Sequence, residues 1–129
     1  VAQTWRSLED ETVHILGLGF RPDVKVDTFS PAYALRDHLL EIGANVTLED
    51  PHYTTSELES AGFATGLSEA ASLVILNTAH TAFASPDFAR WRRGAVRAVL
   101  DGRNLWNQAS AEEAGLVYFG VGRSSRLEL

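Results

Sequence analysis

The chain has 129 residues, of which 45 % are hydrophobic and 22 % are charged, as in an ordinary globular protein. This length supports one sizeable hydrophobic core, so two large catalytic domains are excluded within this chain. Eleven Lys and Arg stand against 17 Asp and Glu, for a formal charge of −6, which argues against a nucleic-acid partner. The absence of cysteine excludes disulfides, cysteine-ligated metals and a thiolate nucleophile.

Membrane, targeting and metal-binding patterns are also missing from the sequence. No apolar run approaches the roughly 20 residues that span a bilayer, so we expect no membrane partner. The chain opens on Val1 without a charged and then apolar leader, and we expect it to be a piece of a longer protein. The histidines are scattered rather than spaced as a ligand set, so we expect no metal site: His14, His38, His52 and His80.

The first half of the chain alternates strand and helix patterns. The apolar run 12–18 ends in glycines and predicts a buried strand that runs into a loop. Ser30 as N-cap, Pro31 in the first turn and Gly43 after the last turn predict a helix over 31–42. The remaining predictions here are strands at 45–49 and 73–76 and short helices at 56–60 and 66–72.

The second half continues the same alternation. A short amphipathic helix is predicted at 87–93, a strand at 95–100, a tight turn at 101–104, a helix at 109–114 and a strand at 116–120. Five strands alternating with helices predict an α/β fold, a Rossmann-like three-layer sandwich with a mostly parallel sheet in the order 2-1-3-4-5. Ligands bind such sheets beyond the carboxyl ends of the strands, which directs attention to 20–29, 77–80 and 101–106.

Gly17 and Gly19 follow the first strand as the glycines of a dinucleotide fingerprint would. The third glycine of that fingerprint is replaced by Pro22, which lacks the amide and prevents close helix packing, so independent NAD binding is disfavoured. Glu49 and Asp50 end the second strand, where an acid can bind a ribose, although Asp50 before a proline is also a common turn.

An ordered set of short motifs resembles one family over most of the chain. The segments are 13–23, 30–32, 39–44 and 49–51, followed by 73–77 and by 99–106 with its Asp-Gly-Arg turn. Together they are similar to the C-terminal domain of the UDP-glucose/GDP-mannose dehydrogenase family. The run 77–83 and Trp106 lean towards the UDP-N-acetylmannosamine dehydrogenase branch.

The resemblance implies that residues 1–129 form one domain that binds the nucleotide end of a UDP- or GDP-sugar. It implies a longer, cytoplasmic, NAD-dependent 6-dehydrogenase, which oxidises the sugar to a uronic acid for polysaccharide biosynthesis. In the family, NAD binds an N-terminal domain and the catalytic cysteine belongs to a central region. We therefore expect no cofactor, no catalytic residue and no activity in this chain alone.

Four residues are candidates for substrate binding. Phe20 and Arg21 match the family's Phe-Lys pair, Arg103 matches the arginine of its Asp-x-Arg turn, and His80 follows the third strand. Two arginines near one diphosphate suit its oxygens, because the guanidinium forms fork-shaped, charge-assisted hydrogen bonds. Each residue also has a simpler interpretation: packing for Phe20, solvation or an Asp partner for Arg21, a turn for Arg103 and helix capping for His80.

Two departures from the family pattern bear on function. Arg21 stands where the family has lysine, which keeps the charge and changes its geometry. Thr28 replaces an arginine that in the family reaches towards NAD, so contact with the cofactor is not expected.

The alternative interpretation is a non-catalytic α/β assembly or docking module derived from the same domain, with a homodimer as one outcome. A receiver or flavodoxin-like regulator fits less well. Asn77 stands where a receiver needs aspartate, and the first loop lacks the hydroxyl groups of an FMN site.

Overall fold

A computed structural model describes residues 8–19, 21–26, 30–66 and 71–120 of the chain. Its centre is a five-stranded parallel sheet in the order β2-β1-β3-β4-β5. This confirms the predicted fold class and strand order. The strands are β1 (Thr12–Leu16), β2 (Asn45–Glu49), β3 (Leu73–Leu76), β4 (Ala98–Asp101) and β5 (Val117–Gly120).

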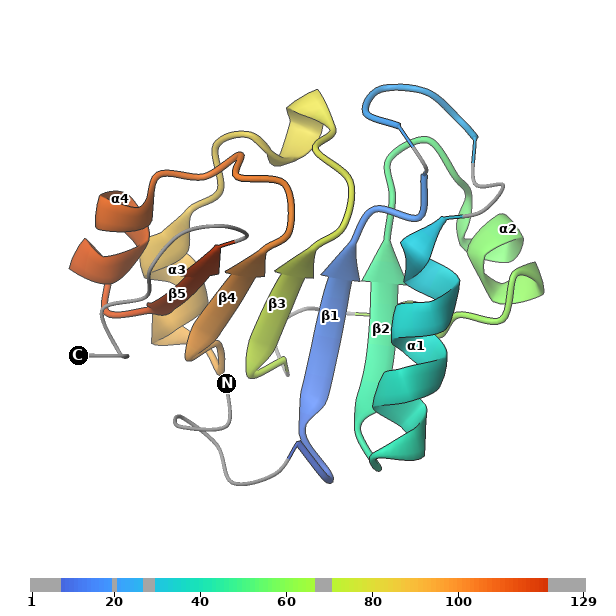
Figure 1. The fold of residues 1–129 in the computed structure, drawn as a ribbon, viewed down its shortest axis with the longest axis horizontal. Coiled ribbons are helices and arrows are strands. Elements are labelled where there is room, and N and C mark those ends of the chain that lie inside the picture. Colours follow the sequence, from blue (N-terminus) through green and yellow to red (C-terminus); the bar gives the residue numbers. More distant parts are fainter. Residues whose placement is uncertain (1–7, 20, 27–29, 67–70, 121–129) are drawn as a thin grey trace.

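Helices cover both faces of the sheet and make the three predicted layers (Figure 1). Helix α1 lies over β1 and β2, and α3 and α4 lie on the opposite face near β4 and β5. The helices are α1 (Pro31–Glu41), α2 (Thr55–Ser60), α3 (Phe88–Arg93) and α4 (Gln108–Glu113), with one 3-10 turn, η2 (Thr81–Phe83).

The alternation of side chains along the strands gives each face its own core. Val13 and Ile15 of β1 pack with Leu39 of α1, whereas Leu16 packs on the other face with Trp106. Burial of these apolar side chains is the main force that holds the layers together. No helix in the described part of the chain combines the length and apolar character needed to span a bilayer.

The ends of α1 follow the sequence signals closely. The Ser30 hydroxyl accepts a hydrogen bond from the amide of Ala32 at 3.2 Å, and Pro31 occupies the first turn. Gly43, with a φ of +90°, reverses the chain after the helix. The N-cap at Ser30 and the glycine at Gly43 therefore set the two ends of this helix.

The main differences from the predicted elements occur before β3 and β4. The predicted strand at 95–100 is observed at Ala98–Asp101, because residues 94–95 form the turn after α3 and the ladder with β3 begins at Ala98. Of the helix predicted at 66–72, residues 67–70 lie outside the described residues, and Ala71 and Ser72 are not helical.

Gly17 lies where the chain leaves β1 between its two neighbouring strands. Its amide donates to the carbonyl of Glu49 at 2.8 Å, and its carbonyl accepts from the Asn77 side chain at 3.0 Å. Its φ is +101°, and a Cβ here would lie 2.4 Å from both Cβ and Oγ1 of Thr78. Any side chain therefore clashes with the end of β3 as well as straining the backbone.

We expect Gly17→Ala to lower the free energy of unfolding by more than about 1 kcal/mol, because the clash and the positive φ act together. Urea unfolding followed by circular dichroism measures this loss. Gly66→Ala is the matched control, since a Cβ at Gly66 meets nothing within 4 Å, and its effect should stay within about 0.5 kcal/mol. Equal effects of the two substitutions would contradict the role given to Gly17.

Candidate functional site

The loops that follow β1 to β4 meet at the carboxyl edge of the sheet. The chain passes from β1 to β2 on one side and returns to β3 on the other, so the strand order reverses between β1 and β3. Loops diverge at such a point and leave room for a ligand. The predicted segments after the first, third and fourth strands are therefore brought to one edge.

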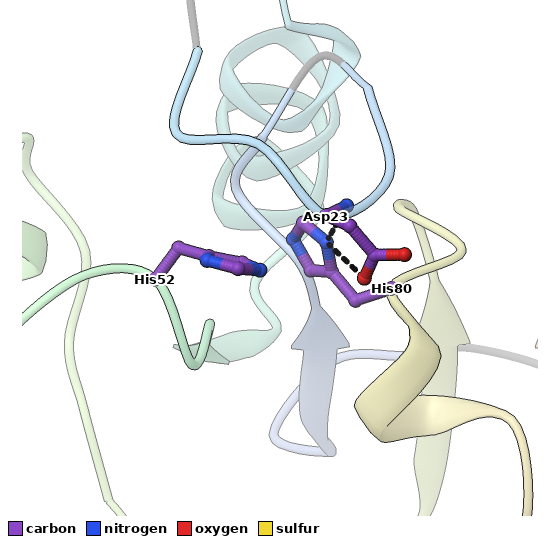
Figure 2. A group of neighbouring side chains, drawn as sticks. All are labelled: Asp23, His52 and His80. Atoms are coloured by element: carbon purple, nitrogen blue, oxygen red, sulfur yellow. Dashed lines mark hydrogen bonds and ion pairs between the residues drawn. The ribbon is translucent and has the colours of Figure 1, made fainter.

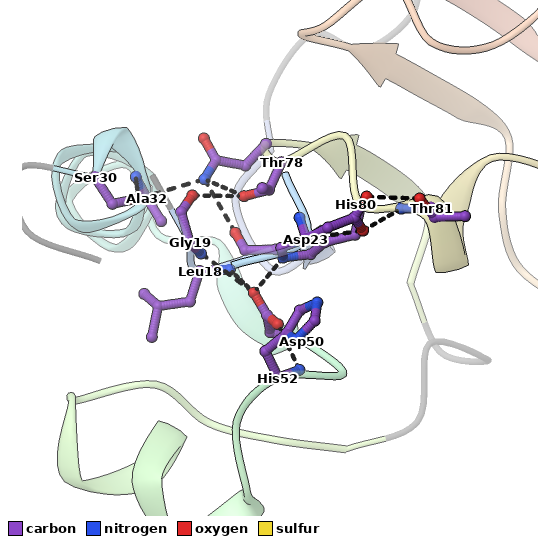
Figure 3. A network of polar contacts seen from close by, with 12 residues as sticks. Leu18, Gly19, Asp23, Ser30, Ala32, Asp50, His52, Thr78, His80 and Thr81 are labelled. Carbon is purple, nitrogen blue, oxygen red and sulfur yellow. Dashed lines mark hydrogen bonds and ion pairs between the residues drawn. The ribbon is translucent and has the colours of Figure 1, made fainter. Parts of the chain in front are cut away.

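Asp50, directly after β2, is the centre of a buried network (Figure 3). Its Oδ2 accepts from the amide of Leu18 at 2.8 Å and from the amide of Gly19 at 3.2 Å. The same oxygen lies 2.9 Å from Nε2 of His80, and Oδ1 accepts from the amide of His52 at 2.8 Å. A carboxylate that receives so many donors compensates for its burial and ties three loops together.

His80 follows β3 and is completely buried, with 0 % of its surface exposed. Its Nδ1 accepts a hydrogen bond from the amide of Asp23 at 2.7 Å, while Nε2 contacts Asp50. The rings of His52 and Phe83 pack against it, with centroids at 4.6 Å and 5.7 Å. His80 is the N-cap residue of η2, as the capping interpretation expects, but its side chain makes no cap bond and contacts Asp23 and Asp50 instead.

The end of β3 also holds the loop that leaves β1. The hydroxyl of Thr78 donates to the carbonyl of Gly19 at 2.7 Å, and the side chain of Asn77 donates to the carbonyl of Gly17. Both side chains are buried. The first residues of this loop are thus held through both their amide and their carbonyl groups.

Asp23 supplies the cap that His80 does not. Its Oδ1 accepts from the amide of Thr81 at 2.7 Å, and its Oδ2 accepts from the hydroxyl of Thr81 at 2.6 Å. The bond from the Thr81 hydroxyl, and after it the bond from the Thr81 amide, hold the pKa of Asp23 below its ordinary value of 3.8. The carboxylate therefore closes the β1 loop onto η2.

Asp23, His52 and His80 present possible metal-ligating atoms within 4.8 Å of one another (Figure 2). The structure uses two of these three groups otherwise. Both ring nitrogens of His80 have protein partners in Asp23 and Asp50, and the Asp23 carboxylate already accepts two bonds from Thr81. We interpret the group as a hydrogen-bond network that joins loops.

Asp101 ends β4 and organises the turn after it. Its Oδ1 accepts from the amides of Arg103 and Leu105, both at 3.1 Å. Its Oδ2 accepts from the amide of Trp106 at 2.7 Å and from the hydroxyl of Tyr118 at 2.8 Å. The carboxylate is fully buried, so the backbone that carries Arg103 is rigidly defined.

Arg103 lies at the rim of a hollow of about 260 Å³ between α1 and the sheet. Its Nε donates to the carbonyl of Asn77 at 2.6 Å, which restricts the rotation of the guanidinium. Apolar side chains line the hollow next to it: Leu35, Ile75 and Leu100. A cation beside an apolar wall suits a ligand that joins an anionic group to an uncharged ring.

Arg21 is an exposed residue of the loop between β1 and α1. Within the described part of the chain, neither Arg21 nor Arg103 forms an ion pair, whereas Lys25 of the same loop pairs with Glu57. Lys25 also lies over the ring of Tyr53. Among the described residues, the charges of Arg21 and Arg103 are therefore not neutralised by an acidic side chain, whereas the charge of Lys25 is.

The two acidic residues at the end of β2, Glu49 and Asp50, both have protein partners. His14 of β1 is buried, with its ring 2.6 Å from the hydroxyl of Thr47 and 2.7 Å from Glu49 Oε1. Glu49 thus contacts β1, and Asp50 is enclosed by protein donors. Asp50 is therefore committed to protein donors rather than to a ribose, whereas Glu49 contacts His14 through one carboxylate oxygen.

Comparison with known proteins identifies the family. Residues 14–108 match the UDP binding domain of the UDP-glucose/GDP-mannose dehydrogenase family. The chain belongs to this family. It is similar to a UDP-glucose 6-dehydrogenase of Pseudomonas aeruginosa, with 31 % identity over 89 % of this chain and 28 % of that protein. The chain thus spans less than a third of the curated relative's length.

Solved structures of dehydrogenases share the fold. An NDP-N-acetyl-D-galactosaminuronic acid dehydrogenase from Methanosarcina mazei superposes with a TM-score of 0.82 and 24 % identity, over 99 % of this chain and 28 % of that one. A UDP-glucose dehydrogenase from Pyrobaculum islandicum superposes with a TM-score of 0.72 and 27 % identity, over 95 % of this chain and 28 % of that one. The resemblance based on sequence motifs is therefore confirmed.

The candidate residues of this dehydrogenase-family domain do not all occupy the same kind of position in the structure. Arg21 and Arg103 lie in loops at the carboxyl edge, and His80 lies beneath that edge, enclosed by protein. Phe20 and Thr28 lie outside the described residues. Sequence reasoning overlooked the structural roles of Asp50 and Asp101, although the signal was present: Asp50 directly follows β2, and Asp101 is the last residue of β4.

We expect Asp101→Asn to lower the stability of the domain by about 1.5–3 kcal/mol. The amide replaces one acceptor oxygen by an NH2 group, which then points at groups that themselves donate. Urea unfolding measures the change. Asp87→Asn is the control, because the exposed Asp87 caps α3 through one bond to the amide of Arg90, and asparagine caps equally well. A loss no larger than that of the control would refute the role of Asp101.

Because the pKa of Asp23 is lowered, the contribution of Thr81 to the stability of the domain should depend on pH. A carboxyl with a depressed folded pKa stabilises the protein above its unfolded pKa of 3.8 and loses this contribution as the pH falls through the folded pKa. We therefore expect Thr81→Val to destabilise the domain at neutral pH and to approach the parent chain in strong acid.

Urea unfolding of both chains across this pH range tests the prediction. In an Asp23→Asn background the carboxyl no longer titrates, so the effect of Thr81→Val should not change with pH. If Thr81→Val lowered the free energy of unfolding by the same amount at every pH while Asp23 is present, the link between Asp23 and Thr81 would be wrong.

Proposed function

We propose that this domain binds the diphosphate of a UDP- or GDP-sugar at the carboxyl edge of the sheet, with Arg21 and Arg103 as the binding cations and with Phe20 and His80 contributing to the same site. The observation that carries the proposal is the placement of Arg103. It sits at the rim of an apolar-lined hollow, its backbone held by Asp101 and its side chain by Asn77, and it has no ion pair among the described residues.

The charge balance supports an anionic ligand at this place. The chain carries a formal charge of −6, so a phosphate needs a local basic site. Arginine is suited to phosphate because its guanidinium donates several hydrogen bonds in one plane. Among the described residues, the Arg103 guanidinium has a protein partner only at Nε, and its terminal amino groups can donate to ligand oxygens.

We further propose that residues 1–129 are the nucleotide-sugar-binding domain of a cytoplasmic, NAD-dependent nucleotide-sugar 6-dehydrogenase. Its relatives are more than three times longer, and the proposed N-terminal and central domains would supply the NAD site and the cysteine that this chain lacks. The relatives' names differ in their sugar, one UDP-glucose and another an N-acetylgalactosaminuronic acid. The sugar itself is therefore a matter for ligand titration.

Calorimetric titration with UDP, UDP-glucose, UDP-N-acetylmannosamine and GDP-mannose tests the proposal. Arg103→Ala and Arg21→Ala should each weaken binding by about 1–3 kcal/mol, since each removes a charged hydrogen bond, and every 1.4 kcal/mol is about tenfold in Kd. Arg93→Ala is the control, because Arg93 is exposed on α3, across the sheet from the hollow.

Two results would contradict the proposal. Equal affinity in Arg103→Ala and Arg93→Ala would remove Arg103 from the site. A protein that forms a stable homodimer and ignores every nucleotide sugar would favour the assembly or docking module instead.

A further inference from the structure

The hydrogen bonds of His80 define its protonation state. The backbone amide of Asp23 can only donate, so Nδ1 of His80, at 2.7 Å from it, must carry a lone pair. The proton of the neutral ring is then on Nε2 and is donated to Asp50 at 2.9 Å. His80 is thus a neutral histidine with its tautomer set by one backbone group and one carboxylate.

This geometry gives His80 a specific place in the loop that carries Arg21. The loop is held on one side of Arg21 at Gly19, whose amide and carbonyl bond to Asp50 and Thr78. On the other side it is held at Asp23 through its backbone amide, by the ring of His80. Arg21 lies two residues from each anchor.

His80 itself is not arranged to touch a ligand. Its surface is fully enclosed, and the ring forms part of the buried network drawn in Figure 3. An effect of His80 on binding therefore has to pass through the loop. Fixing a loop before the ligand arrives removes an ordering cost that binding would otherwise bear.

We propose that His80 is a positioning residue for diphosphate recognition: its neutral Nδ1 holds the amide of Asp23 and thereby sets the place of Arg21. This proposal rests on the proposed function, since it assigns His80 an indirect role at the same site. The Asp23 carboxylate, bound to Thr81, holds the loop by a second and separate contact.

Two substitutions separate the two ring nitrogens. The amide of asparagine falls near the position of Nδ1, so His80→Asn keeps an acceptor for Asp23 and gives up the donor to Asp50. The longer glutamine reaches the position of Nε2, so His80→Gln keeps the donor to Asp50 and gives up the acceptor for Asp23. Asp50 retains its three backbone donors in both variants.

Calorimetry with UDP as the probe should find His80→Asn near the parent affinity and His80→Gln about tenfold weaker. Thermal unfolding of both variants controls for general loss of stability. In an Arg21→Ala background, His80→Gln should cause no further loss, because the arginine it positions is gone. Equal losses in Asn and Gln variants, or an undiminished loss without Arg21, would overturn the proposal.

A readout without ligand keeps the proposal separate from the proposed function. Nitrogen-15 NMR of the parent chain should show an unprotonated Nδ1 and a protonated Nε2 at His80. Amide relaxation should show greater motion at Arg21 in His80→Gln than in His80→Asn. If UDP fails to bind while these signals hold, the proposed function fails and the loop-positioning role stands; a protonated Nδ1 or equal motion overturns the role itself.

Discussion

The buried carboxylate of Asp50 joins the loops that leave three neighbouring strands. It accepts backbone amides of the β1 loop and of its own loop after β2, and it receives the ring of His80 from the β3 loop. A buried charge is tolerated only when it is well solvated by the protein, and here four donors supply that solvation. Loops usually separate where the strand order reverses. Here the hydrogen bonds of Asp50 hold them together.

Asp101 plays the corresponding part after β4. It fixes the turn that carries Arg103, and it links this turn to β5 through the hydroxyl of Tyr118. Asp50 thus holds the loop that carries Arg21, and Asp101 holds the turn that carries Arg103. The backbone that carries Arg103 is held by Asp101, and the loop that carries Arg21 is held on either side of it, at Gly19 and at Asp23.

Most of the secondary structure was predictable because its signals are local. β2 and β3 match their predicted bounds, and α1 begins at its predicted first residue and ends one residue before its predicted last one. The predicted start of β4 was wrong because residues 94–95 still belong to the turn after α3, and the ladder with β3 begins only at Ala98. A ladder is a property of two segments, which one segment's periodicity does not reveal.

The sequence by itself determined the α/β class, the strand order, the family and the arginines worth testing, since these rest on periodicity, caps and short motifs. Only the tertiary structure decided the roles of His80 and Asp50. Proximity to the end of β3 suggested a ligand contact for His80, yet the folded loops enclose it and use both of its nitrogens. Hydrogen bonds between residues thirty or more positions apart have no signature in local sequence, because they depend on how three separate loops meet.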